Sequence, residues 1–285
     1  MVATPIGNLA DMSLRALHVL QLADAIACED TRHSQSLLRA YGIDKPGSHW
    51  LAVHQHNEAE AAQAVVQRLQ AGQRVVYVSD AGTPGVSDPG ARLVAAVQAA
   101  GLRSLPLPGA SSVTAALSVA GAVDPASPGF VFAGFLPTKA GERASTVQAL
   151  SAETRTVVLL EAPHRIEDLA HALAVLAERP VTLARELTKQ FEEVTTLPAH
   201  ALGDWLAGGP QRARGEFVVV LHPVAAQQTG GDHTRVLRLL LAELPVKTAV
   251  RLAAEITGAP RNALYEQALQ LKRGDDALAP DGSDD

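Results

Sequence analysis

The sequence predicts an α/β protein with two successive α/β domains and a small C-terminal helical module. Short apolar runs alternate with helical patterns through short turns, which is typical of a largely parallel sheet covered by helices. Two turn-rich segments, 123–129 and 225–232, divide the chain. Its 285 residues, 47% hydrophobic and 19% charged, suffice for two cores. We therefore expect domains at 1–122 and 130–225, a helical module at 233–273 and a disordered acidic tail at 274–285.

In the first domain, each element follows from its apolar pattern and the residues that end it. Gly42 and Gly72 are typical stops at helix C-termini, and Pro89 suits the first turn of a helix. Val2-Ala3 would end a very short first strand, which leaves open whether sequence precedes it. The predicted strands are 25–28, 51–53, 74–78 and 104–107. The predicted helices are one from Leu14 up to the first of these strands, and 34–41, 58–70, 89–101 and 111–120.

The second domain and the C-terminal module are predicted in the same way. Strands are expected at 130–132, 156–160, 181–184 and 217–221, and helices at 143–150 and 166–176. From Arg235 to Arg273 the chain carries seven Lys or Arg and three Asp or Glu, so this helical segment is basic. An apolar helical stripe, a turn at Gly258 and a second helix form a helix-turn-helix pattern. Nucleic-acid contact is expected there, and a solvated helical hairpin is the alternative.

Composition excludes several classes of protein. The net charge of −6 argues against bulk electrostatic coating of nucleic acid, although a local basic patch remains possible. The single cysteine, Cys28, rules out an internal disulfide and most zinc sites and suits the reducing cytoplasm. The pair His54 and His56 lacks a clearly specified third ligand, so no metal is predicted. No apolar run reaches 18 residues, so neither a membrane span nor secretion is expected.

The loop Val78–Gly90 is rich in glycine but is not a phosphate-binding loop. The chain has neither a G-x-G-x-x-G pattern nor a P-loop lysine, and this loop carries Asp80 and Asp88. Carboxylates repel phosphate and favour a cationic or hydroxyl-bearing ligand beyond the carboxyl end of a strand. S-adenosylmethionine, with a sulfonium, an ammonium and a ribose diol, has this chemistry. Helix capping by Asp88 is the structural alternative.

Many short blocks in this chain together resemble one family. These are Thr4–Leu9, Glu29–Arg32, His56–Glu58, Ser79–Pro84, Ser87–Gly90, Leu107–Gly109, Gly134–Pro137, Glu161–Arg165, Ala184–Lys189, Gly215-Glu216, Leu252–Gly258 and Asn262–Tyr265. They are similar to the bacterial ribosomal RNA ribose 2′-O-methyltransferases of the tetrapyrrole methylase superfamily. The resemblance covers nearly the whole chain. It implies two α/β domains with S-adenosylmethionine bound in the cleft between them, and a cytidine of small-subunit (16S) ribosomal RNA as the substrate.

The resemblance also implies which residues bind the methyl donor. This chain departs from the family pattern at two places, a truncated first strand and the detail of Ala110-Ser111-Ser112. On spacing alone, helix capping explains the Ser111-Ser112 turn about as well. The implied donor-binding residues are Ile6, Ser79, Asp80, Thr83, Ser111, Ser112, Ala162 and Leu187.

Two polar clusters, at 29–32 and 185–189, are candidates for the chemistry. A 2′-hydroxyl needs a base or a stabilising cation nearby. The hypothesis is that Asp30 or Glu186 orients or deprotonates the hydroxyl. Lys189, Arg32 and Arg165 would engage phosphate or developing charge. Interdomain salt bridges without a catalytic part are the alternative. The candidate substrate-binding residues are Glu29, Arg32, His56, Asn57, Arg165 and Arg185.

Two rival functions remain open at this level. A carbon methylase of tetrapyrrole biosynthesis would share the fold but would be expected to carry a G-x-G-x-G-D first turn, where this chain has Ala3–Asn8. A non-catalytic ribosome-assembly protein would keep the fold and bind RNA. The substrate could be free RNA or the assembled small subunit. A homodimer is plausible, and the expected location is the cytoplasm.

Overall fold

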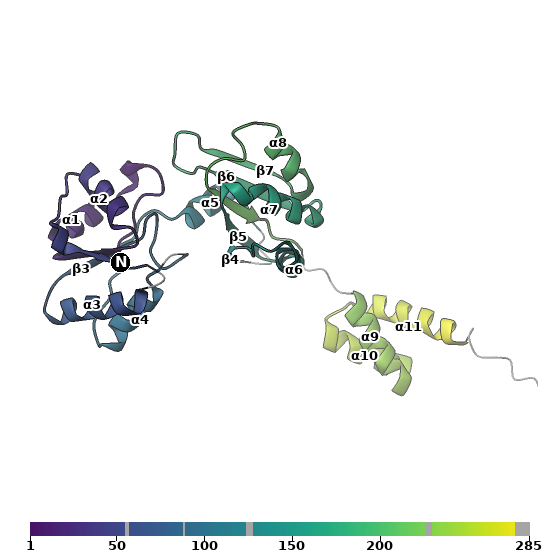
Figure 1. Cartoon of the computed structure of the whole chain (residues 1–285). Coiled ribbons are helices and arrows are strands. Elements are labelled where there is room, and N and C mark those ends of the chain that lie inside the picture. Colours follow the sequence, from purple (N-terminus) through teal and green to yellow (C-terminus); the bar gives the residue numbers. More distant parts are fainter. Residues whose placement is uncertain (55–56, 88, 124–127, 226–229, 277–285) are drawn as a thin grey trace, which may run out of the picture. The chain divides into compact units, whose positions relative to one another are not determined.

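The computed structural model describes residues 1–54, 57–87, 89–123, 128–225 and 230–276 (Figure 1). Residues 1–225 form one compact unit that contains two sheets, and residues 226–285 form a second unit. The predicted division between 1–122 and 130–225 therefore falls inside the first unit. Five short 3-10 helices are described, at Leu9–Asp11, Gly47–His49, Pro163–Arg165, Ala174–Leu176 and Ala199–Ala201.

The first sheet is parallel, with strand order β2-β1-β3. Its strands are β1 (Ala25–Cys28), β2 (Trp50–Ala52) and β3 (Val75–Val78), close to the predicted ranges. The predicted strand 104–107 is present only as an isolated bridge between Leu107 and Val2. The helices connected to this sheet are α1 (Leu14–Leu22), α2 (Thr31–Ala40), α3 (Glu58–Gln70) and α4 (Ala91–Ala99).

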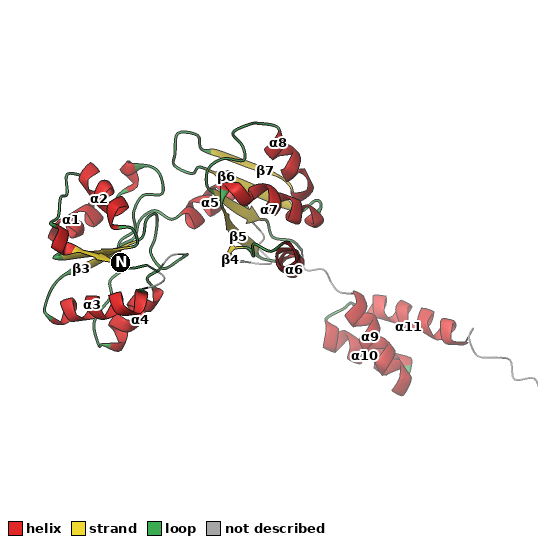
Figure 2. Ribbon diagram, in the orientation of Figure 1, coloured by secondary structure: helices red, strands yellow, loops and turns green. Residues whose placement is uncertain are grey.

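Alternating side chains of these strands pack on opposite layers of helices. Ile26 and Cys28 lie in a core with α1 and α2, whereas Ala27 and Tyr77 lie in a core with α3 and α4. Figure 2 shows one helix pair on each side of the sheet. This follows from the period of two in a strand. It leaves the loops after the strands at the carboxyl edge of the sheet, where ligands of open α/β sheets bind.

The second sheet is mixed, with strand order β4-β5-β8-β6-β7. Only β4 and β5 pair in parallel, and the other neighbours are antiparallel. The sequence analysis predicted neither the strand β7 (Glu193–Pro198) nor the helix α8 (Leu202–Ala207). The strands are β4 (Phe130–Phe135), β5 (Thr156–Glu161), β6 (Pro180–Arg185), β7 (Glu193–Pro198) and β8 (Phe217–Leu221). The helices α6 (Ala140–Ser151), α7 (Ile166–Leu173) and α8 (Leu202–Ala207) contribute to the core on one face.

Helix α5 (Ser112–Ala120) covers the opposite face of the second sheet. Its buried side chains Val113, Ala116 and Ala120 pack with Val158 and Val220 of the central strands. The sequence placed this helix in the first domain, since it follows the last predicted strand there. Its small apolar residues instead complete the core of the second sheet, so the turn before α5 connects the two sheets.

The C-terminal unit contains three helices around a small core. They are α9 (Gly230–Glu243), α10 (Val246–Thr257) and α11 (Arg261–Asp276). Leu237, Val250 and Leu264 are among the buried core residues. Gly258 ends α10 at φ +70°, a left-handed conformation that favours glycine, and its N–H donates to the Ala254 carbonyl. Helix α11 extends past the predicted start of the acidic tail at 274, and residues 277–285 lie outside the described residues.

Candidate active site

Three loops of the first sheet lie together beyond the carboxyl end of β3. Thr4 and Gly82 exchange two backbone hydrogen bonds of 3.0 Å. The Thr83 hydroxyl donates to the Ala110 carbonyl over 3.0 Å, which joins the loop after β3 to the turn before α5. Gly82 has φ +77°, and an added Cβ would lie 3.3 Å from Ile6 Cγ2, so conformation and close approach both favour glycine. The loops that the sequence identified separately are therefore in contact.

A cavity of about 310 Å³ lies between these loops and strand ends of the second sheet. This volume is at the lower end of the range for small-molecule sites, about 300–1,000 Å³. Six of the eight residues predicted to bind the methyl donor line it, namely Ile6, Thr83, Ser111, Ser112, Ala162 and Leu187. They come from both sheets and from the segments that connect them. The fold thus brings most of the predicted donor-binding residues around one space.

The charged side chains of this cavity are acidic. Glu161 and Glu216 line it, and the described residues of its wall include no Lys, Arg or His. Ser111 begins α5 without a side-chain capping bond, so its hydroxyl is not used at the helix terminus. An acidic wall repels phosphate and favours a ligand that brings positive charge and hydrogen-bond donors.

Ser79 and Asp80 do not line the cavity, although the sequence predicted both as donor ligands. Ser79 is 1% exposed, and its hydroxyl donates to the carbonyls of Ala81 and Gly82. Asp80 Oδ1 accepts a hydrogen bond of 3.2 Å from the Asp30 backbone N–H. Both residues thus make hydrogen bonds that hold the loop after β3 in shape, and their predicted contact with the methyl donor stays a prediction. Asp88, the predicted helix cap, lies outside the described residues.

Asp30 is the N-cap of α2. Its Oδ1 accepts from the backbone N–H of Arg32 at 2.8 Å and of His33 at 3.4 Å. These backbone hydrogen bonds lower the pKa of the Asp30 carboxyl. The cap also explains why α2 begins at Thr31 and not at the predicted Ser34. A capping carboxylate with a lowered pKa is a weak base, so the catalytic role of Asp30 stays a prediction with a clear structural competitor.

Lys189 lies between two carboxylates. Its Nζ donates to Glu186 Oε1 over 2.9 Å and to Glu216 Oε2 over 3.0 Å. Partial burial lowers the Lys189 pKa, but the bonds to both carboxylates outweigh it, so the pKa is raised. Partial burial raises the Glu186 pKa, but hydrogen bonds from Lys189 and from the Glu216 N–H outweigh it, so the pKa is lowered. The cluster is a fixed cation between two anions, and Glu216 also lines the cavity.

The turn that carries this cluster has a strained backbone. Glu186 has φ +51° and Thr188 has φ +66°, both in the left-handed region that residues other than glycine adopt infrequently. Thr188 is β-branched, so this conformation is the more unusual of the two. The Glu186 N–H donates to the Glu216 carbonyl over 3.0 Å, and the Thr188 N–H donates to Glu192 Oε2 over 2.6 Å. Such conformations persist where surrounding contacts hold them, and they are concentrated at functional sites. This observation supports a functional role for the turn.

The structure gives Arg185 a role different from the predicted substrate contact. The residue is 7% exposed, and its guanidinium donates to the carbonyls of Arg214 and Phe191 over 3.3 and 3.0 Å. It also pairs with Glu193 at 3.3 Å. Arg185 therefore holds the loops around 191 and 214, because a guanidinium buried on the protein's own carbonyls is not presented to RNA.

The other predicted substrate residues differ in availability. The Arg32 side chain is 91% exposed, and Glu29 is half-buried directly after β1. Asn57 orders the connection between β2 and α3, since its Oδ1 accepts from the His54 N–H and its Nδ2 donates to the Ala52 carbonyl. Of Glu29, Arg32 and Asn57, Arg32 is therefore the best placed to bind the phosphates of RNA. His56 lies outside the described residues.

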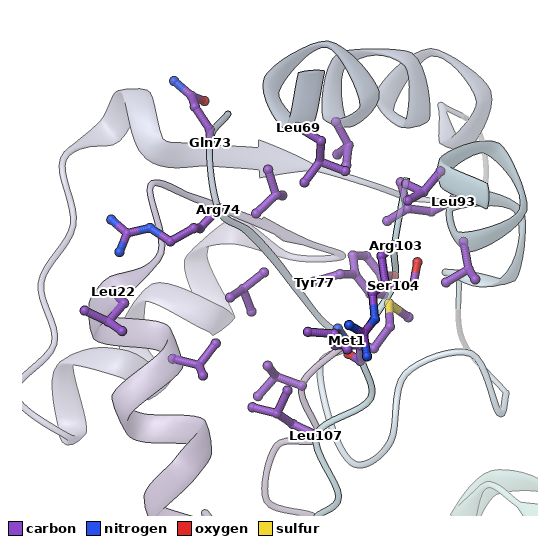
Figure 3. A pocket seen from close by; sticks show the side chains of 18 of the residues that line it. Met1, Leu22, Leu69, Gln73, Arg74, Tyr77, Leu93, Arg103, Ser104 and Leu107 are labelled. Atoms are coloured by element: carbon purple, nitrogen blue, oxygen red, sulfur yellow. Dashed lines mark hydrogen bonds between the residues drawn. The ribbon is translucent and has the colours of Figure 1, made fainter. Parts of the chain in front are cut away.

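A second cavity, of about 410 Å³, lies in the first part of the chain and is lined mainly by apolar side chains (Figure 3). Leu22, Leu69, Leu93 and Leu107 are among them. This cavity contacts Arg74 and β3 itself, and not the loop that follows β3. Ligands of open parallel sheets bind beyond the carboxyl ends of the strands, so we do not assign the methyl donor to this cavity.

Sequence reasoning missed most of the residues at the ends of strands that line the cavity of about 310 Å³. They include Leu160, Glu161, Ala184, Glu216, Phe217 and Val218. Glu161 is the last residue of β5 and Glu216 directly precedes the first residue of β8. Both lie inside blocks that carried the family resemblance, and this position was an available signal. Among the described residues, no group of three or more His, Cys, Asp or Glu could hold a metal ion. No helix in the described ranges has the length and hydrophobicity to span a bilayer.

Comparison with known families identifies the class of protein. The family of Tetrapyrrole (Corrin/Porphyrin) Methylases matches residues 1–203, and the RsmI C-terminal HTH domain matches residues 225–272. Among solved structures, diphthine synthase has a TM-score of 0.58 at 16% identity, covering 78% of this chain and 88% of that one. Cobalt precorrin-4 methyltransferase has a TM-score of 0.56 at 19% identity, covering 78% and 92%. The chain belongs to the tetrapyrrole methylase family and has its fold.

Relatives with closer sequences narrow the class to one family. A Pseudomonas aeruginosa protein named ribosomal RNA small subunit methyltransferase I is 50% identical over 275 residues, covering 94% of this chain and 95% of the relative. The protein of that name from Escherichia coli O157:H7 is 45% identical over 273 residues, covering 94% and 93%. This chain belongs to the ribosomal RNA small subunit methyltransferase I family. The predicted helix-turn-helix of the C-terminal module is confirmed by the domain match.

Proposed function

We propose that this protein transfers a methyl group from S-adenosylmethionine to the ribose 2′-oxygen of a cytidine in 16S ribosomal RNA. The observation that carries the proposal is the identity of 50% and 45%, over 94% of the chain, to ribosomal RNA small subunit methyltransferases I. The cavity adds physical support. Its wall presents the carboxylates of Glu161 and Glu216, whose cationic partners Arg165 and Lys189 do not line it, and this suits the sulfonium and ammonium groups of the donor.

The transfer is an in-line displacement. The 2′-oxygen attacks the methyl carbon, the carbon–sulfur bond breaks, and the hydroxyl proton leaves, so S-adenosylhomocysteine is the second product. Positioning of the two reactants supplies most of the rate enhancement. Lys189 is protonated, because its pKa is raised, so it would serve by stabilising negative charge on the oxygen or by holding a phosphate. Glu186 is ionised at neutral pH, and because its lowered pKa makes it a weak base, it would orient the hydroxyl, whose proton passes to water.

The C-terminal module is proposed to bind the RNA. Its three helices carry the basic excess seen in the sequence, and two of them form the helix-turn-helix. Ion pairs use part of this charge, because Arg251 and Arg261 both pair with Glu255. We propose the small ribosomal subunit as the physiological substrate, a homodimer as the functional form and the cytoplasm as its location.

The proposal is tested by methyl transfer from labelled S-adenosylmethionine. The substrates are small subunits from a strain lacking the modification, protein-free 16S RNA and a tetrapyrrole precursor. We expect label on one cytidine ribose of the RNA, mapped by resistance of the 2′-O-methylated position to alkaline hydrolysis. Label on the tetrapyrrole alone would replace the proposal with a carbon methylase. RNA binding without any transfer would replace it with a non-catalytic assembly protein.

A further inference from the structure

Glu161 carries a buried carboxylate oxygen that the protein leaves unused. The residue ends β5, its side chain is 1% exposed, and it lines the donor cavity. Its Oε1 accepts a hydrogen bond of 2.9 Å from the Ala162 N–H. Its Oε2 has no hydrogen-bond partner among the described residues. Buried polar atoms are nearly always satisfied, so an exception in a cavity wall needs an explanation.

The neighbouring arginine does not supply the missing bond. Arg165 Nε lies 3.2 Å from Oε1, and this contact balances charge on that oxygen. The Arg165 Nε–H group is not oriented to donate to this oxygen, because Nε has no hydrogen-bond partner among the described residues. The Arg165 guanidinium instead donates to the Leu136 carbonyl, which keeps it on the chain segment after β4. Glu161 is therefore held in place on one oxygen, while the other remains free to accept.

We infer that Glu161 positions the methyl donor, with Oε2 accepting a hydrogen bond from an N–H group of S-adenosylmethionine. This inference rests on the proposed function. The donor has two such groups, the α-ammonium of its methionine part and the amino group of its adenine. Both match a fixed anionic acceptor in a wall that contains no cation among the described residues. Glu161 touches the donor and not the reacting atoms, so its effect is on donor binding and alignment.

The test measures binding of S-adenosylhomocysteine to the full-length protein by calorimetry. Glu161→Gln keeps the shape of the side chain but replaces the anionic acceptor, and we expect the Kd to rise about 10- to 100-fold. Glu161→Asp keeps the charge and serves if the glutamine variant fails to fold. Glu142→Gln, an exposed carboxylate paired with Lys139 outside the cavity, controls for net charge and should leave the Kd unchanged.

Two analogues distinguish direct contact from a structural role. 5′-Methylthioadenosine lacks the ammonium, and S-inosylhomocysteine lacks the adenine amino group. The analogue without the contacted N–H group should bind the wild-type and Glu161→Gln proteins equally, which identifies the group. Equal weakening of every ligand, or of none, would overturn the inference. If the wild-type protein bound no S-adenosylhomocysteine, the proposed function itself would fail, and this outcome is distinct.

Discussion

Replacing Gly7 by alanine should displace Lys189. The residue lies in the loop that follows Val2, and an added Cβ would be 2.4 Å from Lys189 Cγ and 3.1 Å from Lys189 Cε. Gly7 is not among the glycines with positive φ, so alanine is compatible with its backbone. The substitution therefore tests mainly the close packing against the Lys189 side chain, with a smaller overlap with Thr188 Oγ1, which would lie 3.1 Å from the added Cβ.

The size of the effect follows from the overlap. Ordinary contact begins at 3.4 Å, so Lys189 Cγ or the loop around Gly7 must move by about 1 Å. Overpacking of this kind costs roughly 1–3 kcal/mol of folding free energy. The movement also pulls the Lys189 ammonium away from Glu186 and Glu216, which it contacts at 2.9 and 3.0 Å. If Lys189 takes part in the reaction, a shift of about 1 Å should slow methyl transfer about 100-fold.

Urea unfolding and single-turnover methyl transfer measure the two effects separately. Gly141→Ala is the matched control, because an added Cβ there meets nothing within 4 Å and the residue lies in α6. It should be neutral or stabilising by up to about 1 kcal/mol. In a Lys189→Ala background the main overlap is gone, and Gly7→Ala should then cost less than about 1 kcal/mol. An equal cost in both backgrounds would refute the assignment of this contact.

Two further predictions concern single residues. Asp30→Asn keeps an acceptor for the α2 cap and should retain stability, whereas Asp30→Ala should lose about 0.5–2 kcal/mol. Lost turnover in the asparagine variant, at an unchanged urea midpoint, supports a catalytic carboxylate, and normal turnover leaves Asp30 as a cap alone. Cys28 is fully buried, and burial raises the pKa of its thiol from 9.0 to about 11. Because the folded-state pKa is the higher one, stability should fall as pH rises from about 9 to 11. The thiol should react with a disulfide reagent only after unfolding, and rapid reaction of the native protein would contradict its burial.

The helices and strands that the sequence predicted well carry their own local signal. The range of α3 was predicted as observed, because an alanine-rich apolar stripe ends at a glycine. The strand β7 was missed, since Glu193–Pro198 is polar at several positions and half-exposed, and it becomes a strand by pairing with β6. The start of α2 was predicted three residues late, because the role of Asp30 as a cap depends on where its side chain points.

The sequence by itself determined the class of protein and six of the residues that line the cavity, whereas the acidic residues of the wall are not the ones that the sequence pointed to. These follow from motifs and from strand ends, which depend on neighbours in the chain. Only the tertiary structure decided which polar residues reach the cavity. Asp80 and Arg185 are used by the protein's own backbone, whereas Glu161 and Glu216 form the acidic wall. Burial and pairing of this kind join residues far apart in the sequence, such as Lys189 and Glu216, and local pattern does not encode them.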